Sequence, residues 1–445
     1  MKIFFASLGC DKNLVDSEKM LGILGKEGYA FTDDETQAEI IIVNTCCFIG
    51  DAKEESIQTI LELAQQKETG SCQALIVTGC LAERYQKELM EELPEVDGCL
   101  GIGSWQQIGE LVAQVLEGKR QQLFGGKDTL PGRTAARTLT TGGHYAYLKI
   151  AEGCDKHCTY CVIPKVRGTY RSVPMEELLE EAKELAAQGV KELILVAQET
   201  TVYGVDLYGE KSLPKLLHKL CLVAGIQWIR LLYCYPEEIT EELIQTIKDE
   251  PKICHYLDIP IQHASDAVLK RMGRRTTRAE ITERIGRLRE AIPDIALRTT
   301  LIAGFPGETE EDHEICMDFI DEIEFDRLGV FAYSAEEDTA AAAMPEQIPQ
   351  EVKEERRDAL MELQQEIAFA HCQDMIGTEV EVLIEGKVAD EPVYVGRTYM
   401  DAPNVDGYIF VNTGELLMSG TLVPVRVTGA NEYDLIGELT EEYDA

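Results

Sequence analysis

Residues 147–161 read Tyr-Leu-Lys-Ile-Ala-Glu-Gly-Cys-Asp-Lys-His-Cys-Thr-Tyr-Cys, an apolar strand followed at once by three cysteines. Loops that follow the strands of an α/β barrel form its active site. Three thiolates on one tight loop, here Cys154, Cys158 and Cys161, can hold three irons of a four-iron cluster and leave the fourth iron open to a substrate. A zinc site that uses His157 is the alternative. Zinc normally takes four ligands and paired C-x2-C halves, so the C-x3-C-x2-C spacing favours the cluster.

The sequence around this loop repeats a strand and then a helix. Apolar runs predict six strands, separated by amphipathic helical stretches. Six such units are two short of a closed eight-stranded barrel, so we expect a partial, open (βα)6 barrel. The predicted strands span 147–151, 192–197, 228–233, 256–261, 296–303 and 327–331.

Five segments follow from the same reading. Strand–helix alternation before the cysteine loop predicts a parallel sheet covered by helices. A glycine- and threonine-rich linker comes next, and a charged helix leads out of the barrel. Short strands separated by Gly, Pro and Asn then predict a small antiparallel β-barrel. The predicted parts are 1–120 (α/β sheet), 121–143 (linker), 144–350 (partial barrel), 351–373 (helix) and 374–445 (β-barrel).

Three more cysteines, Cys10, Cys46 and Cys80, each lie just past a predicted strand of the first part. The carboxyl ends of parallel strands face one crevice, where three thiols can converge on a second cluster. Buried free cysteines are an equally good interpretation of the spacing alone. Cys47 points the other way on an extended backbone and is left out. Seven others show no cluster spacing and are assigned to the core: Cys72, Cys99, Cys221, Cys234, Cys254, Cys316 and Cys372.

The charge of the chain limits its partners. Its 445 residues include 80 Asp+Glu against 42 Lys+Arg, a formal net charge of −38. Nucleic acids and anionic membranes are bound through Lys and Arg, so this excess disfavours both and favours a basic partner. No stretch approaches the ~20 apolar residues of a membrane span, and the first residues do not form a signal peptide. We therefore expect a cytoplasmic protein, whose thiols serve as metal ligands, catalysts or core residues.

The C-x3-C-x2-C loop at the start of a partial barrel resembles that of the radical S-adenosylmethionine (SAM) enzymes. The resemblance implies that the open iron binds SAM and that reductive cleavage yields a 5′-deoxyadenosyl radical. It places Tyr160 near the adenine. Three residues become candidate SAM contacts: Glu199 and Gly304, which follow predicted strands, and Arg298, which lies inside one. Ordinary turn chemistry would also explain the residues at the strand ends.

The first part resembles the N-terminal domain of methylthiotransferases through Asn44-Thr45-Cys46-x-Phe48 and the residues from Asp51 to Ser56. In that family Cys10, Cys46 and Cys80 would hold an auxiliary cluster. The resemblance thus implies two 4Fe-4S clusters, two SAM per turnover, and a final β-barrel that is a substrate-docking TRAM domain. Replacing an unactivated C–H bond by C–S needs a radical, because no side chain is a strong enough base.

Methylthiotransferases modify either a tRNA adenosine or a protein aspartate. Residues 373–445 carry 15 acidic and 3 basic side chains, a net of −12, which favours a basic protein over tRNA. Residues 396–407, 197–206 and 258–265 resemble the branch that modifies the β-carbon of an aspartate in small-subunit ribosomal protein twelve, with a flavodoxin-like reductant. One alternative is a tRNA methylthiotransferase. Another is an iron–sulfur electron carrier or RNA-binding module without SAM chemistry.

Overall fold

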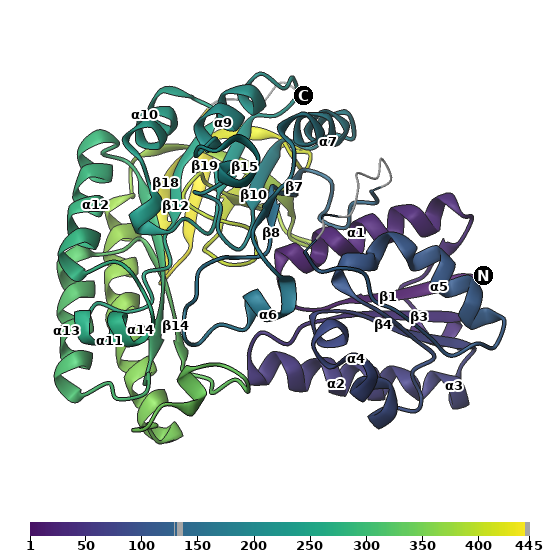
Figure 1. Ribbon diagram of the computed structural model, residues 1–445. Helices are drawn as coiled ribbons and strands as arrows, with labels where there is room; N and C mark the ends of the chain where they lie inside the picture. The colour runs from purple at the N-terminus through teal and green to yellow at the C-terminus, as the bar shows by residue number, and fades with distance from the viewer. Residues whose placement is uncertain (129, 131–136, 441–445) are drawn as a thin grey trace.

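The computed structural model describes residues 1–128, 130 and 137–440, which form three successive domains, each built on its own sheet (Figure 1). The predicted fold class is confirmed: a parallel α/β sheet, an open parallel barrel and a small closed β-barrel follow one another. Residues 129 and 131–136 of the predicted linker, and 441–445 of the predicted last part, lie outside the described residues.

The first domain is a six-stranded parallel sheet in the order β2-β1-β3-β4-β5-β6. Its central strands β3 and β4 are buried at every position, as their continuous runs of Ile, Val and Leu require in a sheet covered on both faces. The strands are β1 (Lys2–Ser7), β2 (Ala30–Phe31), β3 (Ile40–Thr45), β4 (Ala74–Gly79), β5 (Gly98–Leu100) and β6 (Gln121–Leu123). The helices are α1 (Asp11–Lys26), α2 (Gly50–Ala64), α3 (Gln66–Thr69), α4 (Cys80–Glu92) and α5 (Ile108–Leu116).

The second domain is the predicted open barrel, six parallel strands in the order β14-β13-β12-β11-β10-β7. Helices cover its convex face, two of them begun by capping boxes at Thr277 and Thr309. Its strands are β7 (Tyr145–Lys149), β10 (Glu192–Val196), β11 (Trp228–Leu231), β12 (Ile253–Asp258), β13 (Ala296–Ala303) and β14 (Arg327–Ala332). A short pair, β8 (Ala151–Glu152) and β9 (Arg171–Ser172), follows β7. The helices are α6 (Ile163–Arg167), α7 (Met175–Ala187), α8 (Val205–Tyr208), α9 (Leu213–Cys221), α10 (Glu241–Asp249), α11 (Asp266–Arg271), α12 (Arg278–Ala291) and α13 (Glu310–Ile323).

The long helix α14 (Gln350–Asp374) leads to a closed five-stranded barrel in the order β15-β16-β17-β19-β18. Closure leaves this small sheet without an unpaired edge. Its strands are β15 (Glu379–Lys387), β16 (Val393–Arg397), β17 (Ile409–Asn412), β18 (Leu422–Ala430) and β19 (Leu435–Leu439).

Several strand limits differ from the predictions. β11 stops before Tyr233, whose φ of +60° cannot continue a strand. β12 runs from 253 to 258 rather than 256 to 261, because Pro260 has no N–H for the ladder. The short strands β5 and β6 and the last strand β19 were not predicted, and β6 lies inside the segment expected to be a linker.

The concave face of the open barrel is filled by the other two domains. One apolar cluster joins Tyr145 and Tyr256 of the barrel to Val15 of α1 and to Leu383 and Ala402 of the C-terminal domain. The concave face of the open barrel is therefore buried rather than exposed to solvent. The two neighbouring domains complete its core, as the yellow C-terminal strands behind the teal strands show (Figure 1).

Candidate active site

The predicted cluster loop lies directly after β8, with Cys154 and Cys158 buried and Cys161 partly exposed. Backbone hydrogen bonds fix the loop at both ends: Cys154 N–H donates to Gly168 O (3.1 Å) and Cys161 N–H to Cys158 O (3.1 Å). Burial raises the pKa of the Cys154 and Cys161 thiols to about 12. Iron would therefore have to displace the protons when it binds, as thiolate-ligated metals do.

Two side chains beside this loop were not predicted as site residues. Tyr235, just past β11, places its hydroxyl 3.9 Å from the Cys158 sulfur. The Arg274 guanidinium lies 4.2 Å from the centre of the Tyr235 ring. Spacing gave no signal for either residue. For Tyr235, however, its position at the end of a barrel strand was a usable cue.

Buried polar atoms without partners gather near the same loop. Among the described residues, the Glu199 carboxylate has one such oxygen, and Nε and Nη1 of Arg274 have no acceptor. Burial raises the pKa of Glu199 to about 8, opposed mainly by hydrogen bonding to Thr201. Buried groups of this kind normally find partners, so both the donor set and the unpaired groups fit a cluster with a polar ligand such as SAM.

The predicted SAM contacts fall in different surroundings. Tyr160 is in the loop, edge-on to Phe305, and its pKa is raised by burial and then by Cys158. Gly304 donates its N–H to Glu308 (2.8 Å), and a Cβ there would lie 2.3 Å from Lys353 Cγ, so its close approach is to protein. Arg298 pairs with Asp258 (2.9 Å) and, in the C-terminal domain, with Asp406 (3.3 Å).

The three N-terminal cysteines lie on neighbouring loops at the carboxyl ends of β1, β3 and β4. Gly9, with φ of +85°, permits this approach: a Cβ at Gly9 would lie 2.7 Å from Cys46 Cβ. Cys80 begins α4 after Gly79, where a Cβ would meet Asn44 Oδ1 at 2.3 Å. Burial has the largest effect on the pKa of Cys80, and Cys47, Cys10 and Cys46 each raise it further. The structure thus brings the three thiols together.

Side chains of the predicted motif hold these loops. Ser56 Oγ accepts from Cys46 N–H (3.0 Å) and donates to Cys46 O (2.9 Å). Asn44 donates to Asn13 O (2.9 Å), linking the second loop to α1. The Asn-Thr-Cys motif and the serine ten residues beyond its cysteine therefore have a local structural role, independent of any bound metal.

Neither cysteine set is arranged for a single metal ion. Within the described ranges, no group of three His, Cys, Asp or Glu side chains has the close spacing that one ion requires. A four-iron cluster takes each thiolate on a different iron, so its ligands stand further apart.

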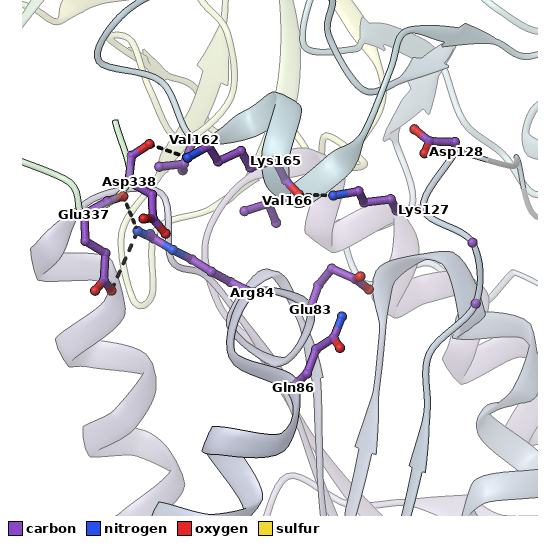
Figure 2. A pocket seen from close by; sticks show the side chains of 12 residues that line it. Glu83, Arg84, Gln86, Lys127, Asp128, Val162, Lys165, Val166, Glu337 and Asp338 are labelled. Carbon is purple, nitrogen blue, oxygen red and sulfur yellow. Dashed lines mark hydrogen bonds and ion pairs between the residues drawn. The ribbon is translucent and has the colours of Figure 1, made fainter. Parts of the chain in front are cut away.

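A cavity of about 480 Å³ lies where α4, residues 125–128, α6 and residues 337–338 meet (Figure 2). Two of its basic side chains donate to backbone carbonyls: Lys127 Nζ to Lys165 O (2.6 Å) and Arg84 Nη2 to Glu337 O (2.9 Å). None of the predicted site residues lines it. Val162, which follows Cys161, lines the cavity, but none of the six cysteines does.

Among the helices of the described residues, none combines the length and apolar character that a membrane crossing needs.

Comparisons with known families match all three domains. Residues 2–101 match "Uncharacterized protein family UPF0004", residues 148–320 the radical SAM superfamily, and residues 376–440 the TRAM domain. Among solved structures, the radical SAM methyltransferase TsrM from Kitasatospora setae, with cobalamin and a [4Fe-4S] cluster bound, is similar in fold. Its TM-score is 0.54 at 15% identity, over 74% of this chain and 71% of that one.

Curated relatives are far more similar. "Ribosomal protein uS12 methylthiotransferase RimO" of Lachnoclostridium phytofermentans is 63% identical over 437 residues, covering 98% of this chain and 99% of that protein. The protein of the same name from Clostridioides difficile is 49% identical over 442 residues, covering 99% of each chain. Fold, cysteine loops and matched families define a radical SAM transferase with an N-terminal cysteine-bearing sheet and a TRAM barrel. The chain belongs to the RimO family of methylthiotransferases.

Proposed function

We propose that this enzyme inserts a methylthio group at the β-carbon of an aspartate in ribosomal protein uS12. The observation that carries the proposal is the pairing of two three-cysteine sites, one at the strand ends of each α/β domain. The name of relatives up to 63% identical, ribosomal protein uS12 methylthiotransferase, supports the substrate. A ribosomal substrate also agrees with the expected cytoplasmic location.

Cys154, Cys158 and Cys161 would hold the SAM-cleaving cluster, and Cys10, Cys46 and Cys80 the auxiliary one. When bound, the cluster at Cys154, Cys158 and Cys161 supplies the electron that cleaves SAM, and the auxiliary cluster supplies a site for sulfur. The overall change is balanced: one substrate C–H, one sulfide and two SAM give the methylthio product, S-adenosylhomocysteine, methionine and 5′-deoxyadenosine. The reaction needs no net oxidant. A flavodoxin-like protein is the proposed priming reductant.

The C-terminal barrel would dock the substrate. Its net charge of −12 complements a basic ribosomal protein and would repel the phosphates of tRNA. Buried charge pairs also fix it against the radical SAM domain, as Arg298–Asp406 and Arg327–Asp401 show. A docked protein would then be held at a set position relative to the cysteine loops.

The test uses reconstituted enzyme, SAM, dithionite and purified uS12, with tRNA in a parallel reaction. We expect a mass gain equal to SCH3 replacing H on one aspartate of uS12, and unchanged tRNA nucleosides. A 2-methylthioadenosine in the tRNA instead would refute the substrate assignment while leaving the radical chemistry in place.

Two triple variants separate the cysteine sites. Cys154, Cys158 and Cys161 changed together to Ala should abolish 5′-deoxyadenosine formation and lower bound iron by about four per chain. Cys10, Cys46 and Cys80 changed together should lower iron equally but keep SAM cleavage, without methylthio product. Replacing Cys72, Cys99 and Cys221 by Ala is the control, and it should change neither iron nor product. Iron that stays unchanged in either of the first two variants would contradict the ligand assignment.

A further inference from the structure

Arg167 is the most completely enclosed large charged side chain near the cysteine sites. It ends the short helix α6, which begins two residues after Cys161, and only 1% of its surface is exposed. A buried guanidinium is costly unless charged and polar partners surround it. Its hydrogen-bond partners come from both the radical SAM domain and the N-terminal domain, so Arg167 connects the two.

On one side Arg167 holds the loop that carries the SAM-cleaving cysteines. Its Nη1 donates to both oxygens of Glu152, each at 2.9 Å, and Glu152 lies two residues before Cys154. Glu152 also accepts from Lys149 Nζ (2.7 Å), and Lys149 pairs with Asp16 of α1.

On the other side Arg167 holds the N-terminal cysteine loops through Asn13. Its Nη2 donates to Asn13 Oδ1 at 2.5 Å. The Asn13 amide nitrogen donates to Leu8 O (3.1 Å), just before Cys10, and to Thr45 O (2.9 Å), just before Cys46. The Cys80 sulfur lies 3.7 Å from the same Asn13 oxygen. One amide therefore touches all three loops, and Arg167 fixes that amide.

Arg167 also places a positive charge beside these thiols. Its Nη2 and the Cys80 sulfur contact the same oxygen of Asn13, at 2.5 and 3.7 Å. A thiolate-ligated iron–sulfur cluster is an anion that gains charge on reduction, and nearby charge sets its potential. The four groups Arg167, Lys149, Glu152 and Asp16 balance formally. Loss of Arg167 would leave a net negative charge beside the auxiliary site.

From these contacts we infer that Arg167 is a positioning residue that couples the two cluster sites. It fixes the auxiliary-cluster loops against the SAM-cleaving loop and supplies the positive charge that stabilises the auxiliary cluster. The inference rests on the proposed function, since it takes the six cysteines to be cluster ligands. Arg167 is not proposed to touch substrate. It acts through Asn13 and Glu152.

The test compares Arg167→Met, Arg167→Lys and Arg137→Met in reconstituted holoenzyme. Arg137 is the matched control: it also joins α1 to the radical SAM domain, through Glu18 (2.7 Å) and Glu181 (2.8 Å), but it bonds to neither Asn13 nor Glu152. The auxiliary-cluster potential is measured in each background with Cys154, Cys158 and Cys161 replaced by Ala. The ratio of 5′-deoxyadenosine to methylthiolated uS12 is measured with all six cysteines present.

Arg167→Met should make the auxiliary potential more negative and raise the ratio about tenfold or more, because SAM cleavage continues while transfer is misaligned. Arg167→Lys keeps the charge, but its ammonium group cannot bond both Glu152 and Asn13 as the guanidinium does. The auxiliary-cluster potential should therefore stay near wild type while the ratio of 5′-deoxyadenosine to product rises. Arg137→Met should change neither quantity.

An unchanged potential and ratio in Arg167→Met with both clusters bound would overturn the inference, as would equal changes in Arg137→Met. If Arg167→Met does not fold, Arg167→Lys decides: a wild-type ratio in that variant rejects the coupling role. Wild-type enzyme that binds two clusters but never modifies uS12 would instead refute the proposed function, and the potential measurement would still test Arg167.

Discussion

Replacing Glu192 by Gln should release the C-terminal barrel from the radical SAM domain. Glu192 begins β10 and is completely buried. Its carboxylate accepts from Arg230 Nε (2.7 Å) and, across the domain junction, from Arg397 Nη2 (2.6 Å). The glutamine variant keeps the shape but leaves two buried guanidiniums without the shared negative charge.

The size of the effect follows from the pKa of Glu192. Arg397 and then Arg230 lower it to about 2 against the effect of burial, from 4.5 for the free side chain. At 1.36 kcal/mol for each pH unit, this shift corresponds to about 3 kcal/mol of stability. Removing one partner of a buried ion pair costs a similar ~3–5 kcal/mol. Because the folded pKa is lowered, this stability is present above pH 4.5 and is lost as the pH falls toward 2.

Native-state hydrogen exchange of β16, read by mass spectrometry at pH 7, measures the local opening. We expect exchange about a hundredfold faster in Glu192→Gln, since each 1.4 kcal/mol is a factor of ten. The control is Glu379→Gln, whose pair with Arg426 is more than half exposed and should contribute under ~1 kcal/mol. If β16 exchanges at the same rate in Glu192→Gln and in wild type, the buried pair does not hold the barrel in place.

Three further outcomes can be checked. Gly153→Ala should lower bound iron and the melting temperature, because φ is +77° and a Cβ would lie 2.1 Å from Thr169 O. Gly189→Ala, at φ of +104° with open space around it, should show backbone strain but no loss of iron; equal iron in the two variants would contradict this. Burial raises the pKa of Glu199 to about 8, so the stability of the unliganded enzyme should fall as pH rises from 4.5 to 8, and Glu199→Gln should remove that dependence in melting curves. Raising NaCl from 50 to 300 mM should weaken binding of uS12, as measured by calorimetry, because the acidic barrel attracts a basic partner; a salt-independent affinity would argue against charge-guided docking.

Much of the site was predictable because ligands in parallel α/β domains gather at strand ends. Each of the six cysteines follows a strand in the sequence; spacing singled out Cys154, Cys158 and Cys161, whereas Cys10, Cys46 and Cys80 were chosen over buried free thiols only through the family resemblance. Tyr235 and Arg274 were not predicted, since their partners lie far away in the chain. The roles suggested for Gly304 and Arg298 came from their positions in the sequence. In the structure the Gly304 N–H bonds to Glu308 and the Arg298 side chain pairs with Asp258, and no sequence pattern predicts either contact.

The sequence by itself determined the order of the three domains, the open six-stranded barrel and the cysteine sets, because hydrophobic period and residue spacing are local properties. Only the tertiary structure decided how the domains meet. Arg167 reaches Asn13 from 154 residues away, and Glu192 meets Arg397 across 205 residues. Such pairs form because buried charges must find partners wherever the fold brings them. Their identity depends on the three-dimensional packing of whole domains and leaves no periodic trace along the chain.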